Sequence, residues 1–212
     1  MKRTLILSML ICIAATMWSQ SMQRVSESEA SKMIAAITRA TSSVKTIQCK
    51  FSQEKKVSLL KDKIVSNGKM YYSSAGKLRW EYTSPYSYIF VINNNVVTTK
   101  SGGRKNSIDV ATNKLFKNIT RIMEGSVTGR SLSNNKDYSV TMYKQGNTWV
   151  AHLVPNDRNM KKMFKYVRLY FNANHSLVSK VEMVENNGDS TLIKLYDIET
   201  NKAISDKVFV VD

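Results

Sequence analysis

Side chains that could carry out catalysis are few, and they do not occur in the patterns that catalysis needs. His152 stands between Val150 and Val154 in an alternating apolar segment, which is more typical of a core or sheet-edge histidine than of a general base. His175 follows Asn174 in a turn. No Cys/His cluster has metal-ligand spacing, and the sequence contains no Gly-x-Ser-x-Gly motif and no Gly-rich phosphate-binding loop. The sequence therefore predicts no enzyme, no metal site and no cofactor.

Apolar and aromatic side chains, in contrast, alternate along the chain at the spacing that places them on one face of a strand. The alternating residues are Met70 and Tyr72, then Leu78, Trp80 and Tyr82, then Ile89 and Val91. Such a face can be an ordinary packed core, or it can line a cavity for an apolar ligand. Met33 and Met123, on two predicted helices, favour a pocket that adapts to different chains, because methionine is unbranched and flexible.

The chain is strongly basic, with 32 Lys and Arg against 16 Asp and Glu and a formal net charge of +16. Removal of Lys2 and Arg3 with a signal peptide would leave +14. This charge favours anionic partners, and for an exported protein these are acidic lipid headgroups or glycans rather than nucleic acid. The alternative is that the excess positive charge only keeps the protein soluble and binds no partner.

The first twenty residues are predicted to be a secretory signal peptide rather than part of the fold. Lys2 and Arg3 precede an apolar run from Thr4 to Trp18, and cleavage is expected near Ser19 to Met22. Cys12 lacks the small preceding residues of a lipid-attachment site. Residues 21–212 then form one domain, and its single cysteine, Cys49, allows no intramolecular disulfide. We expect a periplasmic monomer.

Two amphipathic helices are expected in this domain. Ser26 and Glu29 have capping-box spacing at the start of the first helix. The second helix is expected over Thr112 to Met123, and Gly125 is well placed to end it. The apolar positions of the first helix are Ala30, Met33, Ile34, Ile37 and Val44, and those of the second are Leu115, Phe116, Ile119, Ile122 and Met123.

Most of the remaining chain alternates with period two and predicts a β-meander. Strands are expected over 47–55, 64–73, 77–83, 88–93, 96–100, 138–145, 148–154, 164–171, 178–186 and 190–199. Asn- and Gly-rich turns such as Asn93-Asn94-Asn95 and Asn186-Asn187-Gly188 join neighbouring strands. The predicted fold class is therefore mainly β: one curled antiparallel sheet with the amphipathic helices over its concave face.

Several segments together resemble the LolA family of outer-membrane lipoprotein carriers. They are the Phe-x-Gln strand at Phe51, the segment Ser66-Asn67-Gly68 that enters the next strand, and the aromatic strand from Lys77 in which Pro85 follows Trp80 by five residues. Tyr88 to Val91 resembles the next strand of the family, Asp137-Tyr138 begins the later strands, and Ile204 to Phe209 resembles the closing strand. The resemblance covers essentially the whole chain after the signal peptide.

The resemblance implies an unclosed half-barrel with a helical lid that shields the acyl anchor of lipoproteins while they cross the periplasm. Expected partners are acylated lipoproteins, an inner-membrane lipoprotein-releasing ABC transporter and an outer-membrane receptor, whose existence the sequence leaves open. Trp80, Leu78 and Phe90 match cavity or mouth positions of the family. The full expected cavity set is Trp80, Leu78, Tyr82, Phe90, Met70, Tyr72, Ile89, Val91 and Phe51. The expected lid residues are Met33, Ile34, Ile37, Leu115, Phe116, Ile119, Ile122 and Met123.

The chain departs from the family at one position of consequence. Many members carry an Arg-Pro pair six residues before the tryptophan, and this arginine latches the lid by hydrogen bonding. The chain has Ser74-Ala75 instead, so this latch is absent or replaced. Lys77 and Arg79 are the nearby candidates for a replacement.

Other functions with related folds remain open. The chain could carry a different lipid or glycolipid, or it could sense mislocalised lipoproteins, although sensors of that type carry a further domain. Receptors of this fold need a lipid anchor. A basic module with a solid core that binds an anionic envelope polymer would explain the charge without a cavity, and stoichiometric binding of an apolar probe would exclude it.

Overall fold

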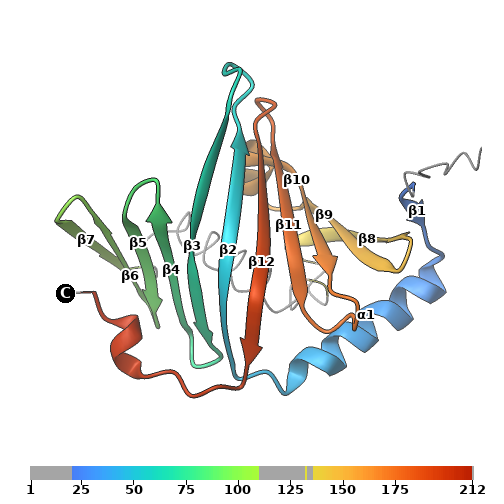
Figure 1. Cartoon of the computed structure of the whole chain (residues 1–212). Helices are drawn as coiled ribbons and strands as arrows, with labels where there is room; N and C mark the ends of the chain where they lie inside the picture. The colour runs from blue at the N-terminus through green and yellow to red at the C-terminus, as the bar shows by residue number, and fades with distance from the viewer. Residues whose placement is uncertain (1–20, 110–131, 133–135, 212) are drawn as a thin grey trace, which may run out of the picture.

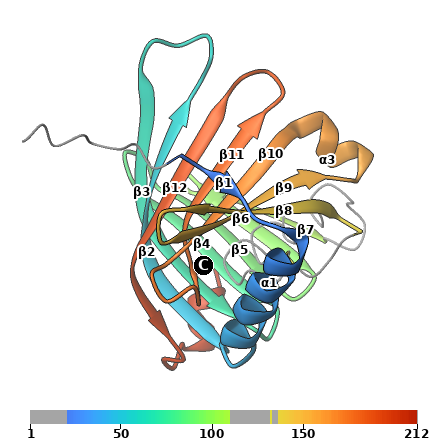
Figure 2. The ribbon, with the colours of Figure 1, turned by 90° about the vertical axis from the view of Figure 1, so that its right-hand side faces the viewer.

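The computed structural model of the chain describes residues 21–109, 132 and 136–211, which form one curled sheet with helices beside it (Figure 1, Figure 2). The expected signal peptide over residues 1–20, with Cys12, lies outside the described residues. So does the expected second helix over Thr112 to Met123, with its lid residues Leu115, Phe116, Ile119, Ile122 and Met123. These parts of the interpretation stay predictions.

Twelve strands pair in the order β1-β8-β9-β10-β11-β12-β2-β3-β4-β5-β6-β7, and every neighbouring pair is antiparallel. The strands β1 to β6 are Gln23–Arg24, Thr46–Lys56, Lys63–Ser73, Lys77–Ser84, Tyr88–Asn93 and Val96–Ser101. The strands β7 to β12 are Arg104–Asp109, Tyr138–Gln145, Thr148–Pro155, Phe164–Phe171, Val178–Glu185 and Ser190–Thr200. The expected antiparallel sheet is confirmed, and each of the ten predicted strands ends within one residue of its expected bounds.

Three short elements were not predicted. β7 is exposed along most of its length and has no alternating apolar pattern, and β1 has only two residues. Helix α3, Arg158–Met163, is too short to show a helical period. It is fixed locally, because the Asp157 carboxylate accepts hydrogen bonds from the backbone N–H groups of Asn159 and Met160.

The two halves of the meander join through a long central pairing of β2 with β12, from Lys56 opposite Ser190 to Ile47 opposite Thr200. The first and last long strands of the domain therefore lie side by side. The sheet ends at β1 on one side and at β7 on the other, so the described strands form an unclosed barrel.

Helix α1, Glu27–Ser42, begins as its capping motif predicts. The Ser26 hydroxyl accepts a hydrogen bond from the backbone N–H of Glu29 at 3.2 Å. Met33 and Ile37 are buried and belong to the same apolar cluster as the side chains of one sheet face. We call the face of the sheet that carries this cluster the inner face. Figure 2 shows α1 lying beside the sheet.

The C-terminal segment corrects one expectation from the family resemblance. Residues Ile204 to Phe209 do not form a closing strand; Asp206–Phe209 is a 3-10 helix, η2, capped by Ser205. Phe209 and Val211 pack with Val91 on the opposite, outer face of the sheet. Arg79 on β4 donates hydrogen bonds to the carbonyls of Val208 and Val210, so backbone groups that would pair within a sheet bind a side chain instead. No helix of the described residues is both long and apolar enough to span a membrane.

Candidate functional site

Three aromatic rings meet at the centre of the inner face, and we call them the aromatic box. Phe51 on β2 stacks on Trp80 of β4, with ring centroids 4.1 Å apart and planes 26° apart. Tyr82, two residues further along β4, meets the edge of Phe51 at 5.2 Å and 86°. Tyr86 and Tyr88 extend this set beyond Tyr82, with centroids 5.8 and 6.1 Å from its ring. The result is a cluster of flat aromatic rings, buried at Phe51 and Trp80, with tyrosine hydroxyl groups toward one end.

A glycine on β3 makes the box possible. Gly68 lies between Phe51 and Tyr82 in the strand register. A Cβ atom at this position would lie 2.0 Å from the Glu81 carbonyl oxygen and 2.5 Å from the Phe51 ring. Only a residue without a side chain lets the Phe51 ring lie over β3, which explains why the Ser-Asn-Gly segment enters this strand.

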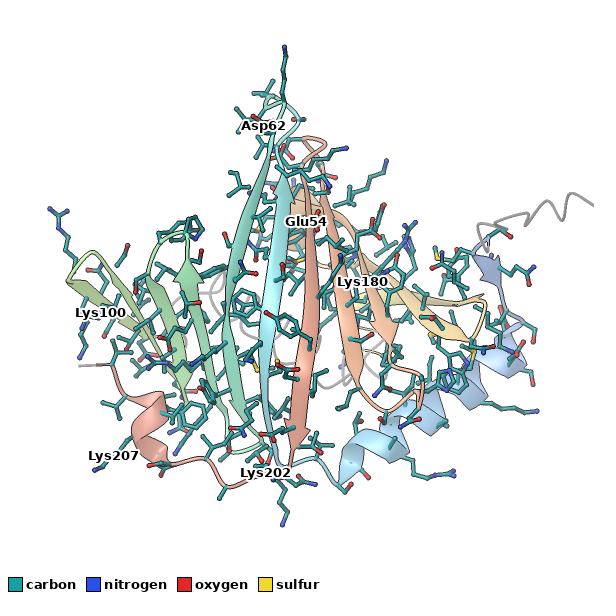
Figure 3. All side chains as sticks on the ribbon, viewed as in Figure 1. Glu54, Asp62, Lys100, Lys180, Lys202 and Lys207 are labelled. Atoms are coloured by element: carbon teal, nitrogen blue, oxygen red, sulfur yellow. The ribbon has the colours of Figure 1, made fainter. Side chains whose placement is uncertain are left out.

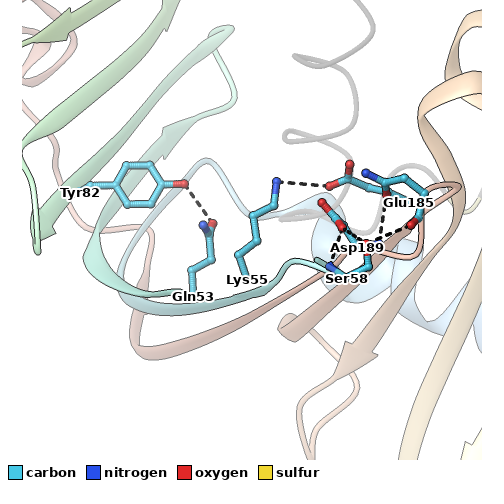
Figure 4. A network of polar contacts seen from close by, with 7 residues as sticks. Gln53, Lys55, Ser58, Tyr82, Glu185 and Asp189 are labelled. Atoms are coloured by element: carbon cyan, nitrogen blue, oxygen red, sulfur yellow. Dashed lines mark hydrogen bonds and ion pairs between the residues drawn. The ribbon is translucent and has the colours of Figure 1, made fainter. Parts of the chain in front are cut away.

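Polar atoms lie next to the rings of the aromatic box. The Tyr82 hydroxyl donates a 3.0 Å hydrogen bond to the Gln53 side-chain oxygen (Figure 4). Burial raises the pKa of Tyr82, and the nearby Trp80 and Gln53 side chains offset this rise only in part. Tyr82 is therefore a neutral hydroxyl at physiological pH.

Two polar atoms of the inner face are buried without a hydrogen-bond partner among the described residues. They are Nε1 of Trp80, a residue only 6% exposed, and Oγ of Ser66, which is 1% exposed. A buried unpaired donor costs on the order of 1–3 kcal/mol relative to a paired one. An acyl ester offers carbonyl oxygens that could accept from such a donor while its chains contact the surrounding apolar wall.

Most of the expected cavity residues do lie together. Trp80 is opposite both Met70 on β3 and Phe90 on β5, and Tyr72 is opposite Leu78. These residues, with Phe51 and Tyr82, belong to the cluster that includes Met33 and Ile37 of α1, with Ile34 packed against it. The described part of the expected lid, helix α1, therefore packs into the same apolar cluster as the expected wall, and its main contacts are with β8.

Two expected cavity residues are on the wrong face. Ile89 and Val91 flank Phe90 along β5 and so point the other way. Val91 packs with Phe209 and Val211, and Ile89 is packed against that outer cluster. Ile89 and Val91 cannot line one cavity together with Phe90, because neighbouring residues of a strand point to opposite faces. The outer face of β5 is also apolar because the C-terminal segment packs on it.

The sequence also places the chain in a known protein family. Over residues 42–212 the sequence matches the family described as outer membrane lipoprotein carrier protein LolA. The chain belongs to the LolA family. No curated protein matches it.

Several solved structures are similar to the chain. An uncharacterised conserved protein from Thermus thermophilus is 10% identical, with a TM-score of 0.51 over 85% of this chain and 92% of that one. A LolA superfamily protein from Nitrosomonas europaea is 10% identical, with a TM-score of 0.45 over 86% and 97%. The MucA/MucB complex of Pseudomonas aeruginosa is 13% identical, with a TM-score of 0.47 over 87% of this chain and 61% of the matched chain.

The missing family latch is not replaced by either nearby candidate. Lys77 forms a 2.8 Å ion pair with Asp206, and Arg79 binds Glu81 and the C-terminal carbonyls. Both cations therefore hold the C-terminal segment on the outer face. Ser74 lies in the β3–β4 turn, where its backbone N–H donates to the Lys45 carbonyl.

The histidines lie apart from the aromatic box, whereas Cys49 is on the inner face, two residues before Phe51 on β2 and opposite Met70. His152 is on the outer face, where its Nδ1 accepts a 3.2 Å hydrogen bond from Arg168 Nε. Burial and the positive charge of Arg168 lower the pKa of His152. His175 stacks on Trp149 in a turn. Burial raises the pKa of the Cys49 thiol to about 12, so this thiol is neither a nucleophile nor suited to disulfide-linked dimers. Among the described residues no group of His, Cys, Asp and Glu could hold a metal ion.

Proposed function

We propose that this chain is a periplasmic carrier that takes the acyl anchor of a lipoprotein onto its inner face and transports it from the inner to the outer membrane. The observation that carries the proposal is the aromatic box, an apolar wall within the family's fold that contains the unpaired N–H of Trp80. Each methylene moved out of water is worth about 0.8 kcal/mol, so an acyl anchor needs such a wall to cross an aqueous gap.

The carrier acts by binding and release and needs no catalytic step. The donor is an inner-membrane lipoprotein-releasing ABC transporter, and the acceptor is an outer-membrane receptor or the outer membrane itself. Because the arginine latch of the family is absent, closure of the lid depends on apolar contacts such as those of Met33 and Ile37. Release then requires an acceptor that binds the acyl chains better than this wall does.

Trp80 gives this proposal a direct spectroscopic test. After the signal peptide the sequence contains two tryptophans, Trp80 in the box and Trp149 at the start of β9. A Trp149→Phe variant leaves Trp80 as the only fluorophore, and a Trp80→Phe variant leaves Trp149. Brominated acyl peptide should quench the Trp80 emission strongly and saturably, and should quench less the emission of Trp149, which is only partly buried against the same cluster. Equal quenching of both, or none, would refute the site.

Native mass spectrometry identifies the cargo. Protein purified from a periplasmic extract without detergent should carry a lipoprotein that detergent removes. A bound free lipid would instead assign the chain to another lipid cargo. A protein that is empty and also ignores added acyl peptide would contradict the carrier function.

A further inference from the structure

The β2–β3 hairpin carries exposed apolar side chains at its tip. Leu59 is 93% exposed and Leu60 is 55% exposed, and both lie between the paired ends of the strands at Lys56 and Lys63. Ile64 and Val65 on β3 are 41% and 49% exposed. This tip projects beyond the neighbouring strands, and Figure 3 shows Asp62 at its end. Two leucines in water at the end of a long hairpin have no role in the core.

The tip is held in place by the neighbouring β11–β12 turn. The Asp189 carboxylate accepts hydrogen bonds from the backbone N–H and the hydroxyl of Ser58, at 2.9 and 3.0 Å (Figure 4). These bonds lower the pKa of Asp189, so the carboxylate stays charged at neutral pH. Lys55 pairs with Glu185 beside this contact. The exposed leucines are therefore presented from a fixed base.

Basic side chains surround the tip from two directions. The hairpin supplies Lys55, Lys56, Lys61 and Lys63. The helix α3 lies at the same end of the sheet in Figure 2, and Asn186 of the β11–β12 turn binds its carbonyls at Lys161 and Met163. This helix and the residues after it add exposed side chains, which are Arg158, Lys161, Lys162 and Lys165. Nearby acids are partly neutralised, because Glu54 pairs with Lys63 and Lys194, and Glu185 pairs with Lys55.

We propose that this end of the sheet is a docking surface for an anionic lipid bilayer: Leu59 and Leu60 enter the interface, and the basic side chains of the hairpin and of α3 contact headgroup phosphates. We call it the crest; it comprises residues 55–65, 158–165 and 186–189. Apolar insertion and electrostatic attraction each give weak membrane binding, and the crest combines them. The surface is separate from the aromatic box, so the proposal holds whether or not the box carries lipoproteins.

Vesicle co-sedimentation tests the crest with the purified protein and without cargo. The protein should bind vesicles of phosphatidylglycerol and phosphatidylcholine, and bind pure phosphatidylcholine much more weakly. Binding should fall at about 1 M salt, where the Debye length is about 3 Å. A double variant, Leu59→Ser with Leu60→Ser, should lower the partition coefficient by about tenfold or more without changing the charge.

Matched variants separate the crest from general effects. Val96→Ser with Val210→Ser removes two exposed apolar side chains away from the crest and should bind as the unmodified protein does. Lys56→Gln with Lys61→Gln should weaken binding by roughly fivefold per lysine. Lys45→Gln with Lys202→Gln removes the same charge from the opposite end, where Figure 3 shows Lys202, and should weaken it less.

A direct readout of insertion is a Leu59→Trp substitution in a chain whose Trp80 and Trp149 are both phenylalanine. Its emission should shift to the blue with anionic vesicles and be quenched by brominated lipid. The proposal is overturned if the protein does not bind anionic vesicles, which would leave a protein partner for the crest. It is also overturned if the leucine variant binds as well as its valine control.

Discussion

The inner face around Trp80 and the outer face around Arg168 differ in how they treat buried polar atoms. On the outer face, Arg168 donates to His152 and to Glu182 at 3.2 Å, and the Tyr170 hydroxyl donates to Glu182 at 3.0 Å. Lys180 lies 3.6 Å from the centroid of the Tyr170 ring. On the inner face, Trp80 Nε1 and Ser66 Oγ have no partner among the described residues.

We interpret this difference as one between polar groups that stabilise the sheet and polar groups that can pair with a ligand. A network in which each polar group is paired stabilises the sheet and leaves no unpaired donor or acceptor for a ligand. An unpaired donor in an apolar wall costs stability and is retained where something else can pair with it. The outer network resembles a catalytic cluster in composition, yet its histidine is already committed to Arg168. On the inner face, Trp80 Nε1 and Ser66 Oγ are buried and are not committed to another side chain in this way.

The largest effect is expected where the inner face is most tightly packed. Gly68→Ala would place a Cβ 2.0 Å from the Glu81 carbonyl oxygen, which backbone cannot move aside at low cost. We expect destabilisation by about 3 kcal/mol or more, measured by urea denaturation. Gly102→Ala is the control, since it meets no atom within 4 Å and costs only the strain of its φ of 53°, about 1 kcal/mol. Equal losses would mean that Phe51 does not press on β3.

The next effect concerns ligand binding at Trp80. Trp80→Ala should keep the β-sheet circular dichroism and lower acyl-peptide affinity by about tenfold or more, because it removes one wall of the box. Trp80→Phe keeps the ring but removes the unpaired N–H. We expect its free energy of unfolding to stay equal or rise by about 1 kcal/mol, since no buried donor is left unpaired. It should weaken binding of ester-linked lipids more than of simple alkyl probes. Unchanged affinity in a folded Trp80→Ala variant would rule out the box as the site.

A smaller effect is expected on the outer face, with the opposite signature. Glu182→Gln removes the charge that binds Arg168 and Tyr170, both partly buried, and should lower the free energy of unfolding by about 1–2 kcal/mol. Acyl binding should not change. Lys63→Gln breaks an ion pair at the surface and should have little effect on stability. Reduced acyl binding in Glu182→Gln would show that the two faces are coupled.

The strand pattern of the sequence predicted the sheet well because alternation of buried and exposed side chains is a local property. It predicted Trp80, Leu78, Met70 and Tyr72 on one face for the same reason. It failed at Ile89 and Val91, where both faces of β5 are apolar and alternation alone cannot tell inside from outside. The deciding information is Phe209, more than a hundred residues away, which covers Val91.

Gly68 and the unpaired Trp80 N–H could not be predicted either. The sequence shows a glycine at a strand entry but not the ring that occupies its space. Which buried donors find partners depends on three-dimensional positions across several strands. The same holds for Arg79 and Lys77, whose partners lie in the C-terminal segment rather than in the lid.

The smallest effect is a pH dependence that belongs to the outer face alone. Burial and Arg168 lower the pKa of His152 below its ordinary value of 6.5, so the unfolded chain takes up this proton at a higher pH than the folded one. Stability is therefore full above pH 6.5 and falls as the pH drops toward the lowered pKa. In denaturation curves between pH 8 and about 5.5, His152→Gln, which keeps an acceptor for Arg168, should flatten this slope. An unchanged slope would mean that a group other than His152 titrates in this pH range. Acyl binding should be the same at pH 8 and at about pH 5.5, because the aromatic box contains no group that ionises between these values.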